Sequence, residues 1–223
     1  MRSRPVVTID GPSGSGKTTV SKRLAEAAGM LRVDTGAMYR AVALSAHRRG
    51  ILWGDPVLLG EVARELDLTF RTVEGAPRVF LGGEDVSAAI RSPEMSMGAS
   101  AVSAHGPVRE ALVAKQREMA REGGVVLEGR DTGTVVFPDA EAKFFLDAAA
   151  AVRARRRRRE IAPPDAQSFE EVLRDVLRRD VQDSTREHSP LRVADGAVYI
   201  DSTTMTVDEV VGEMLRRLPG VPR

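Results

Sequence analysis

The chain has 223 residues, of which 42% are hydrophobic and 29% charged, and its formal net charge is +1. A chain of this length can bury a sizeable core in one domain with inserts, and the composition excludes a disordered tail. No apolar stretch is long enough to span a bilayer, the first residues lack a signal-peptide pattern, and cysteine is absent. We therefore expect a cytoplasmic protein with no membrane contact, no disulfide and no thiolate chemistry.

The first predicted elements are a strand, a glycine-rich loop and a helix. Val6–Ile9 is a β-branched run typical of a buried strand, and residues 18–28 have helical spacing that ends at Gly29. Between them, residues 11–18 read GPSGSGKT, which matches the phosphate-binding pattern G-x-x-x-x-G-K-[ST]. Backbone N–H groups of such a loop bind phosphates, Lys17 is expected to reach the β- and γ-phosphates, and Thr18 to ligate Mg²⁺. The predicted nucleotide-binding residues are Gly11, Pro12, Ser13, Gly14, Ser15, Gly16, Lys17, Thr18 and Thr19.

The remaining elements alternate between helices and apolar strands. We expect strands at 31–33, 68–70, 78–81, 125–127, 143–146 and 198–200. Helices are expected after Asp34, Asp55, Ser92, Gly106, Ser168 and Thr206, and capping boxes pair Ser168 with Glu171 and Thr206 with Glu209. This alternation predicts an α/β fold with a parallel sheet and helices on both faces. The stretch 66–81 breaks the alternation, and with the turn at Gly82-Gly83 it indicates a small inserted β-containing subdomain.

Two polar clusters follow predicted strands, at the edge of the sheet where open α/β folds bind ligands. DTGAMYR contains Asp34, Thr35 and Arg40, and EGRDTG contains Glu128, Arg130 and Asp131. Each alone could be a solvated loop with a local salt bridge. Two such clusters in a chain with a phosphate-binding loop favour a second ligand site.

A phosphate-binding loop of this kind indicates a nucleoside triphosphate but leaves three classes of protein. A GTP-driven switch of the common type needs an N-K-x-D element, and this chain contains no asparagine. An ATPase motor needs a partner or a ring, for which 223 residues leave little room. A small-molecule kinase needs a second pocket for its acceptor, which the polar clusters can supply.

Residues 152–160 read VRARRRRRE and carry six arginines. Such a run is typical of nucleic-acid-binding segments, but acidic residues balance the basic ones along the chain, so we expect no nucleic-acid partner. A helix presents about a third of its surface to one ligand, so at most two or three of these arginines can contact a phosphate.

Five motifs, in their order and spacing, resemble those of the bacterial cytidylate kinases. They are GPSGSGKTT, DTGAMYR, EGRDTGTVVFPDA, RDVQDSTR and YIDSTTMTVDEVV, and the resemblance spans about residues 5–215. It implies an α/β fold of the P-loop nucleoside-monophosphate-kinase type. The implied parts are a core at 1–60 and 101–223, a small β-containing monophosphate-binding insert at 61–100, and a short helical lid at about 152–166.

The same resemblance implies an enzyme that transfers the γ-phosphoryl group of ATP, with Mg²⁺, to CMP and dCMP, and we expect a monomer. Positions that read the base match Ser100, Arg109 and Asp131, and positions near the acceptor phosphate match Arg40, Arg130, Arg179 and Arg186. Asp183 matches a residue that contacts the sugar, and Thr35 stands where the family more often has serine. In the lid, Arg153 and Arg157 are expected to face the phosphates. The implied catalytic residues are Lys17, Arg130, Arg153, Arg157 and Arg179.

The residue chemistry agrees with phosphoryl transfer to a phosphate. A phosphate monoester has its second pKa near ~6, so the acceptor is a dianion at neutral pH and needs no general base. Arginines suit the task because they are always charged and bind phosphate in a bidentate manner. Two alternatives stay open: a kinase of another nucleoside monophosphate or small acceptor, and a non-catalytic nucleotide- or RNA-binding module.

Overall fold

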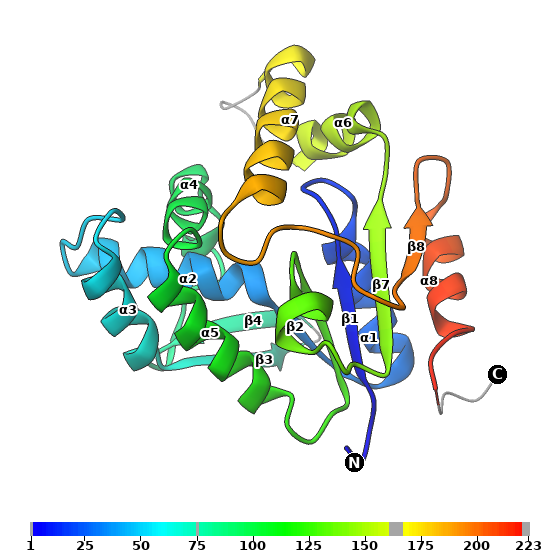
Figure 1. Ribbon diagram of the computed structural model, residues 1–223, viewed down its shortest axis with the longest axis horizontal. Helices are drawn as coiled ribbons and strands as arrows, with labels where there is room; N and C mark the ends of the chain where they lie inside the picture. The colour runs from blue at the N-terminus through cyan, green and yellow to red at the C-terminus, as the bar shows by residue number, and fades with distance from the viewer. Residues whose placement is uncertain (1, 75, 161–166, 220–223) are drawn as a thin grey trace. The chain divides into compact units, whose positions relative to one another are not determined.

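The computed structural model describes residues 2–74, 76–160 and 167–219 of the chain (Figure 1). It contains two compact units. Unit 1 consists of residues 1–32 and 122–223, and unit 2 of residues 33–121. The two units are defined by how compactly the chain packs, whereas the sequence analysis divided the chain by the expected function of each part. The two divisions are therefore not comparable, and the monophosphate-binding insert at 61–100 stays a prediction. Residues 161–166 of the predicted lid lie outside the described residues.

A five-stranded sheet forms the centre of the fold. Its strand order is β2-β6-β1-β7-β8, with β1 (Val6–Asp10), β2 (Leu31–Asp34), β6 (Val125–Gly129), β7 (Ala142–Asp147) and β8 (Val198–Asp201). The pairs β1–β6, β1–β7 and β7–β8 are parallel, which confirms the predicted parallel sheet. The apolar side chains of β1 are fully buried, as expected for the central strand of a sheet that is covered on both faces.

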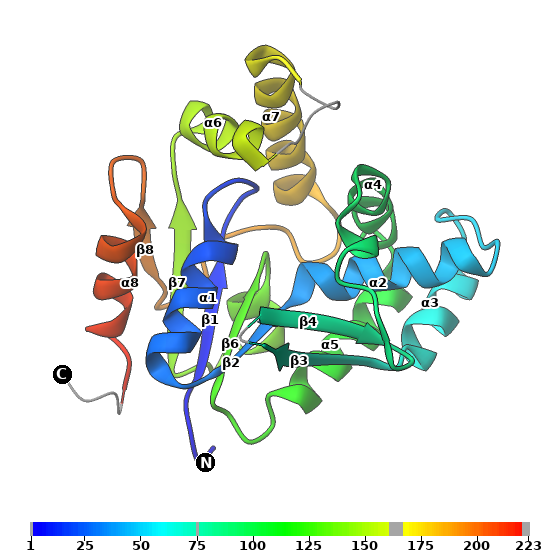
Figure 2. The same ribbon diagram turned by 180° about the vertical axis from the view of Figure 1, so that it is seen from behind.

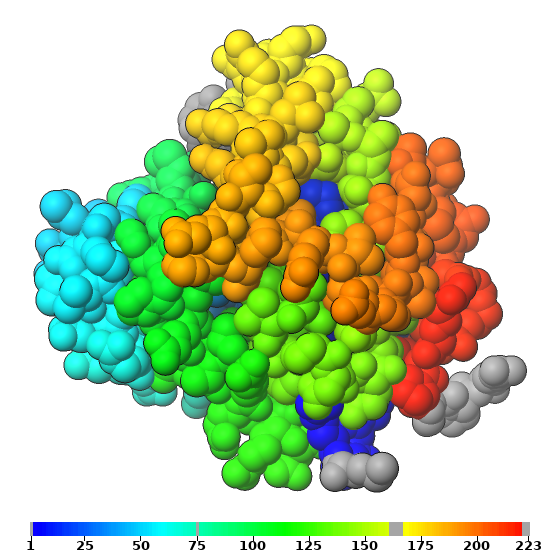
Figure 3. Space-filling view, in the orientation of Figure 1, coloured from blue at the N-terminus to red at the C-terminus, as the bar shows by residue number. Residues whose placement is uncertain are grey.

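The helices of unit 1 are α1 (Lys17–Ala28), α6 (Ala150–Glu160), α7 (Phe169–Thr185) and α8 (Val207–Leu215). Figure 2 shows α1 and α8 on one face of the sheet, where Leu24, Phe144 and Met214 form part of the core. On the other face, Figure 1 shows the short helical turn η2 (Thr132–Val136). Both predicted capping boxes are present, at the starts of α7 and α8. Figure 3 shows α6 and α7 packed side by side, and Ala154 of α6 is buried against Val172 and Val176 of α7.

Unit 2 contains helices and a small antiparallel sheet. The helices are α2 (Thr35–Arg48), α3 (Pro56–Glu65), α4 (Pro93–Val102) and α5 (Gly106–Met119), with a short turn η1 (Ala89–Arg91). The sheet has the order β3-β4-β5, with β3 (Leu68–Val73), β4 (Ala76–Leu81) and β5 (Glu84–Asp85). The predicted helix starts at Asp55 and Ser92 are confirmed, because both side chains accept hydrogen bonds from the first turn that follows. The predicted strands and the Gly82-Gly83 turn are confirmed as well.

Candidate active site

The glycine-rich loop joins the end of β1 to the start of α1, as the sequence predicted. Lys17 is buried, and its Nζ donates to the Pro12 carbonyl oxygen at 2.6 Å and to Ser15 Oγ at 3.3 Å. Burial, assisted by the positive charge of Arg130, lowers the pKa of Lys17 to about 7. This lysine therefore stands where a bound anion would favour its charged form.

Thr18 lies beside the buried carboxylate of Glu128, a member of the EGRDTG cluster to which the sequence gave no specific role. Thr18 Oγ1 donates to Glu128 Oε1 at 3.0 Å, and the Ser21 hydroxyl donates to the other oxygen of Glu128. Arg32 Nη2 lies 2.7 Å from Glu128 Oε1, and both side chains of this ion pair are at most 10% exposed. A hydroxyl and a carboxylate are hard oxygen ligands of the kind that Mg²⁺ prefers, so the pair Thr18 and Glu128 fits this ion.

Asp10, at the end of β1, fixes the turn that follows β6. Its carboxylate accepts from the Thr132 N–H at 2.9 Å, the Thr132 hydroxyl at 2.7 Å and the Gly133 N–H at 2.7 Å. Burial raises the pKa of Asp10, and the three hydrogen bonds act in the opposite direction. These bonds hold the segment that begins directly after Arg130 and Asp131, two of the predicted site residues.

Three predicted catalytic arginines lie near one another in unit 1. Arg130 Nε donates to Asp183 Oδ2 at 2.6 Å, which brings together two residues that the sequence assigned to the acceptor. Burial, then the positive charges of Arg157 and Arg130, lower the pKa of Arg179. In the described part of the chain, Arg179 has no carboxylate within ion-pair distance. Three guanidinium groups that repel one another form a site suited to a polyanion.

Asp131 and Arg186 face each other in the same unit. Arg186 Nη2 lies 3.7 Å from Asp131 Oδ1, and Arg186 Nε donates to the Ser189 carbonyl oxygen at 2.5 Å. Both side chains are largely buried, at 13% and 9% exposure. The pair places a carboxylate acceptor beside a guanidinium donor in unit 1.

The two predicted phosphate-contacting arginines of α6 have different surroundings. Arg153 is buried, and its guanidinium binds both oxygens of Asp180 at 2.9 and 2.7 Å. Arg157 is 37% exposed and pairs with Glu160 at 2.9 Å, three residues further along the same helix. That both arginines contact phosphate stays a prediction.

The other predicted acceptor residues belong to unit 2. Thr35 is buried at the start of α2, and Arg40 Nη2 donates to Asp34 Oδ2 at 3.0 Å. Arg109 is buried with its guanidinium 5.5 Å from the centre of the Tyr39 ring, whereas Ser100 is exposed on α4. Their roles toward a base or phosphate stay predictions.

Sequence reasoning missed Asp10, the last residue of β1, and placed Glu128 in a polar cluster without giving it a specific role. A signal for Asp10 was present in the sequence, because this residue directly precedes the phosphate-binding loop. Asp10 and Glu128 are both acids inside apolar strands, and a buried carboxylate is rare unless it is paired. The residues that supply their partners lie far away in the sequence and could not be read from it.

No cluster of three or more histidine, aspartate or glutamate side chains suited to a metal occurs among the residues that the structure describes. Within the same residues, no helix has the length and apolar character needed to cross a membrane.

The fold and this site define a class of protein, the P-loop kinases. A parallel sheet carries a phosphate-binding loop at the end of its central strand, with a cluster of arginines in the same unit. Comparison with solved structures agrees on the fold: shikimate kinase from Bacteroides thetaiotaomicron superimposes with a TM-score of 0.50 at 13% identity, covering 95% of this chain and 97% of that one.

The chain belongs to the cytidylate kinase family, whose family model matches residues 7–219. It is 53% identical to the cytidylate kinase of Geobacter sp. (strain M21), over 95% of this chain and 91% of that protein. It is also 45% identical to the cytidylate kinase of Caldicellulosiruptor bescii, over 94% of this chain and 93% of that protein. The resemblance carried by the sequence motifs is thereby confirmed.

Proposed function

We propose that the chain is a kinase that transfers the γ-phosphoryl group of ATP to CMP and dCMP. The observation that carries the proposal is its membership of the cytidylate kinase family over residues 7–219. The arginine cluster of unit 1 supports the same chemistry, because phosphoryl transfer needs charge neutralisation and alignment rather than a general base.

Within this proposal, Lys17 binds the β- and γ-phosphates, and Arg130, Arg157 and Arg179 stabilise the negative charge of the transferring group. Arg157 is the more exposed member of the predicted lid pair, and its surface partner Glu160 holds it weakly. Asp183 orients Arg130 through their 2.6 Å bond and is also the residue proposed to contact the sugar.

Mg²⁺ is part of the proposal, with Thr18 and Glu128 as the residues that would hold it. When bound, it neutralises charge on the β- and γ-phosphate oxygens. In the protein itself, Arg32 and Ser21 keep the Glu128 carboxylate fixed beside Thr18.

On the acceptor side, Ser100, Arg109 and Asp131 are proposed to read cytosine, and Thr35, Arg40 and Arg186 to bind the monophosphate. We further propose that the enzyme acts as a monomer in the cytoplasm, without nucleic-acid partners. Light scattering during gel filtration tests the first of these statements, and cell fractionation tests the second.

The direct test is a coupled assay of ADP release with CMP, dCMP, UMP, AMP and GMP as acceptors. We expect turnover with CMP and dCMP well above that with the other three. A higher specificity constant for UMP, AMP or GMP would assign the fold to another acceptor. A complete lack of turnover, with ATP still bound, would favour a non-catalytic module.

A further inference from the structure

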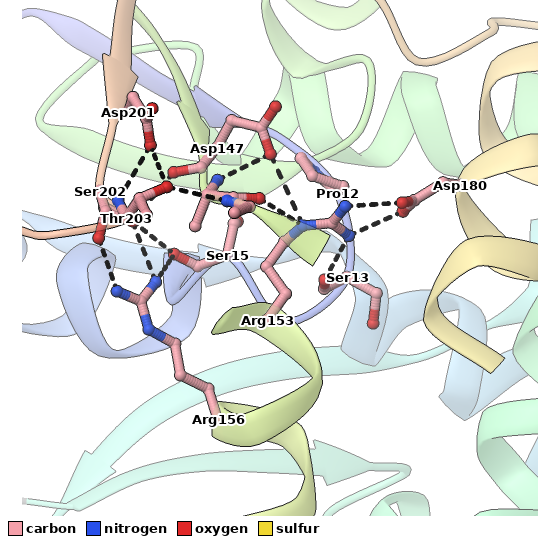
Figure 4. Close-up of polar contacts among 12 residues, drawn as sticks. Pro12, Ser13, Ser15, Asp147, Arg153, Arg156, Asp180, Asp201, Ser202 and Thr203 are labelled. Carbon is pink, nitrogen blue, oxygen red and sulfur yellow. Dashed lines mark hydrogen bonds and ion pairs between the residues drawn. The ribbon is translucent and has the colours of Figure 1, made fainter. Parts of the chain in front are cut away.

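Two arginines of α6 donate hydrogen bonds to the backbone of the phosphate-binding loop. Arg153 Nη1 donates to the Ser13 carbonyl oxygen at 3.2 Å, and Arg156 Nη1 donates to the Ser15 carbonyl oxygen at 3.2 Å. Figure 4 shows the two guanidinium groups reaching these carbonyls from the same helix. The two α6 arginines thus bind main-chain carbonyl groups of the loop rather than its side chains.

Both guanidinium groups are themselves held in place. Arg153 is 6% exposed, forms two bonds to Asp180 of α7, and donates through Nε to the Ala148 carbonyl oxygen at 2.8 Å. Arg156 donates to Ser202 at the end of β8, to Oγ at 3.0 Å and to the carbonyl oxygen at 2.7 Å. A guanidinium that is hydrogen-bonded on several sides is a rigid donor, because its side chain has little conformational freedom left.

The orientation of these carbonyls determines where the neighbouring N–H groups point. In a trans peptide the C=O and the N–H are antiparallel. The Ser13 carbonyl shares its peptide with the N–H of Gly14, and the Ser15 carbonyl shares its peptide with the N–H of Gly16. A carbonyl turned toward α6 therefore directs its N–H to the opposite side. Among the described residues, neither N–H donates to a protein acceptor.

The packing of α6 against the loop supports this arrangement. Gly14 and Gly16 have φ angles of 76° and 94°, in the region that glycine adopts without strain. A Cβ atom added to Gly14 would lie 2.8 Å from the Arg153 carbonyl oxygen and 3.1 Å from its Cβ. The phosphate-binding loop therefore packs closely against the start of α6 at Gly14, where no side chain would fit.

We propose that Arg153 and Arg156 are positioning residues that preorganise the phosphate-binding loop, by holding the Ser13 and Ser15 carbonyls so that the Gly14 and Gly16 N–H groups face the bound phosphates. The inference rests on the ATP site of the proposed function. It gives Arg153 an action through the backbone, in place of the direct phosphate contact that the sequence predicted. Donation to the carbonyl also polarises the peptide and strengthens its N–H as a donor.

The first test observes the loop without any nucleotide, so that it does not depend on the proposed activity. Amide ¹⁵N–¹H spectra would be recorded for the wild type and for Arg153→Met and Arg156→Met. We expect Arg153→Met to move the Gly14 resonance most, and Arg156→Met to move the Gly16 resonance most. Arg159→Met, which changes an exposed arginine of the same helix, is the control and should leave both in place. Unmoved Gly14 and Gly16 resonances in both variants would overturn the proposal.

The second test measures binding of ATP and of inorganic tripolyphosphate by calorimetry. A charge-assisted hydrogen bond contributes about 1.5–3 kcal/mol, so each Met variant should weaken binding about tenfold or more, with CMP affinity changed less than about twofold. Because Arg153 is buried, its Met variant could unfold. Arg153→Lys keeps the charge and should recover part of the affinity, and the half-buried Arg156 tests the idea independently.

Asp180→Asn separates positioning from simple attraction between charges. It removes a negative charge near a polyanion site, so attraction alone predicts tighter ATP binding. Positioning predicts weaker binding, because the Arg153 guanidinium loses the partner that fixes it. Tighter binding in this variant would contradict the proposal, and it would leave the assignment of the chain as a kinase untouched.

Discussion

Lys17 is a residue whose charge depends on what binds beside it. Its pKa is lowered to about 7 from 10.5, first by burial and then by Arg130. Between these two values the unfolded chain holds more protons than the folded protein, so the contribution of Lys17 to stability grows as the pH rises from about 7 to 10.5. A polyphosphate next to Lys17 supplies negative charge and raises its pKa again.

We therefore expect ATP binding at pH 8 to take up close to one proton. Calorimetry in two buffers with different ionisation enthalpies measures this uptake directly. The γ-phosphate is already deprotonated at this pH and supplies no competing uptake. Lys17→Met is the matched control and should bind ATP without proton uptake. Equal proton uptake in the variant and the wild type would show that another group titrates.

Asp131 is the residue that we propose distinguishes cytosine from uracil. A carboxylate accepts from the N4 amino group of cytosine but faces an acceptor oxygen in uracil. An unpaired buried polar group costs about 1–3 kcal/mol, which favours CMP over UMP by about fivefold to 150-fold. Asp131→Ala should damage CMP phosphorylation strongly and UMP phosphorylation much less.

The measurement is the ratio of kcat/KM for CMP and UMP in the wild type and the variant. Asp131→Asn retains an acceptor oxygen without the charge and should give an intermediate ratio. If the alanine variant keeps the wild-type ratio, Asp131 serves only to hold Arg186 and the start of η2 in place.

At the scale of helices and strands, the features that depend on neighbouring residues were predictable. The capping boxes at Ser168 and Thr206 and the proline-started helices at Pro56 and Pro93 are set by residues at most three positions apart. The strands of the sheet were predictable for the same reason, because their apolar runs are short and continuous.

The partners of the α6 arginines could not be predicted, because they depend on how distant segments fold together. Helical spacing limited how many arginines can face one ligand but not which ones. The acceptor of Arg153 on the loop lies 140 residues away, and Asp180 lies 27 residues away in the next helix. Whether an arginine in such a run binds phosphate or backbone is decided by these tertiary contacts alone.

At the scale of the whole molecule, the net charge of +1 and the pairing of the arginine run argue against RNA as a partner. Arg153 and Arg156 bind protein groups, and Arg157 pairs with Glu160. Only Arg155, Arg158 and Arg159 of the run are exposed. Three charges do not make the extended basic surface that nucleic acids require.

We expect weak binding to single-stranded RNA in a filter assay, with a shallow dependence on salt. Each neutralised phosphate of a single strand contributes about −0.7 to the slope of log K against log salt, so three exposed arginines limit the slope to about −2. Replacing Arg155, Arg158 and Arg159 together by glutamine should remove this residual binding and leave CMP phosphorylation unchanged. A slope of −5 or steeper, abolished in the triple variant, would make the run a nucleic-acid site and would contradict the proposed absence of such a partner.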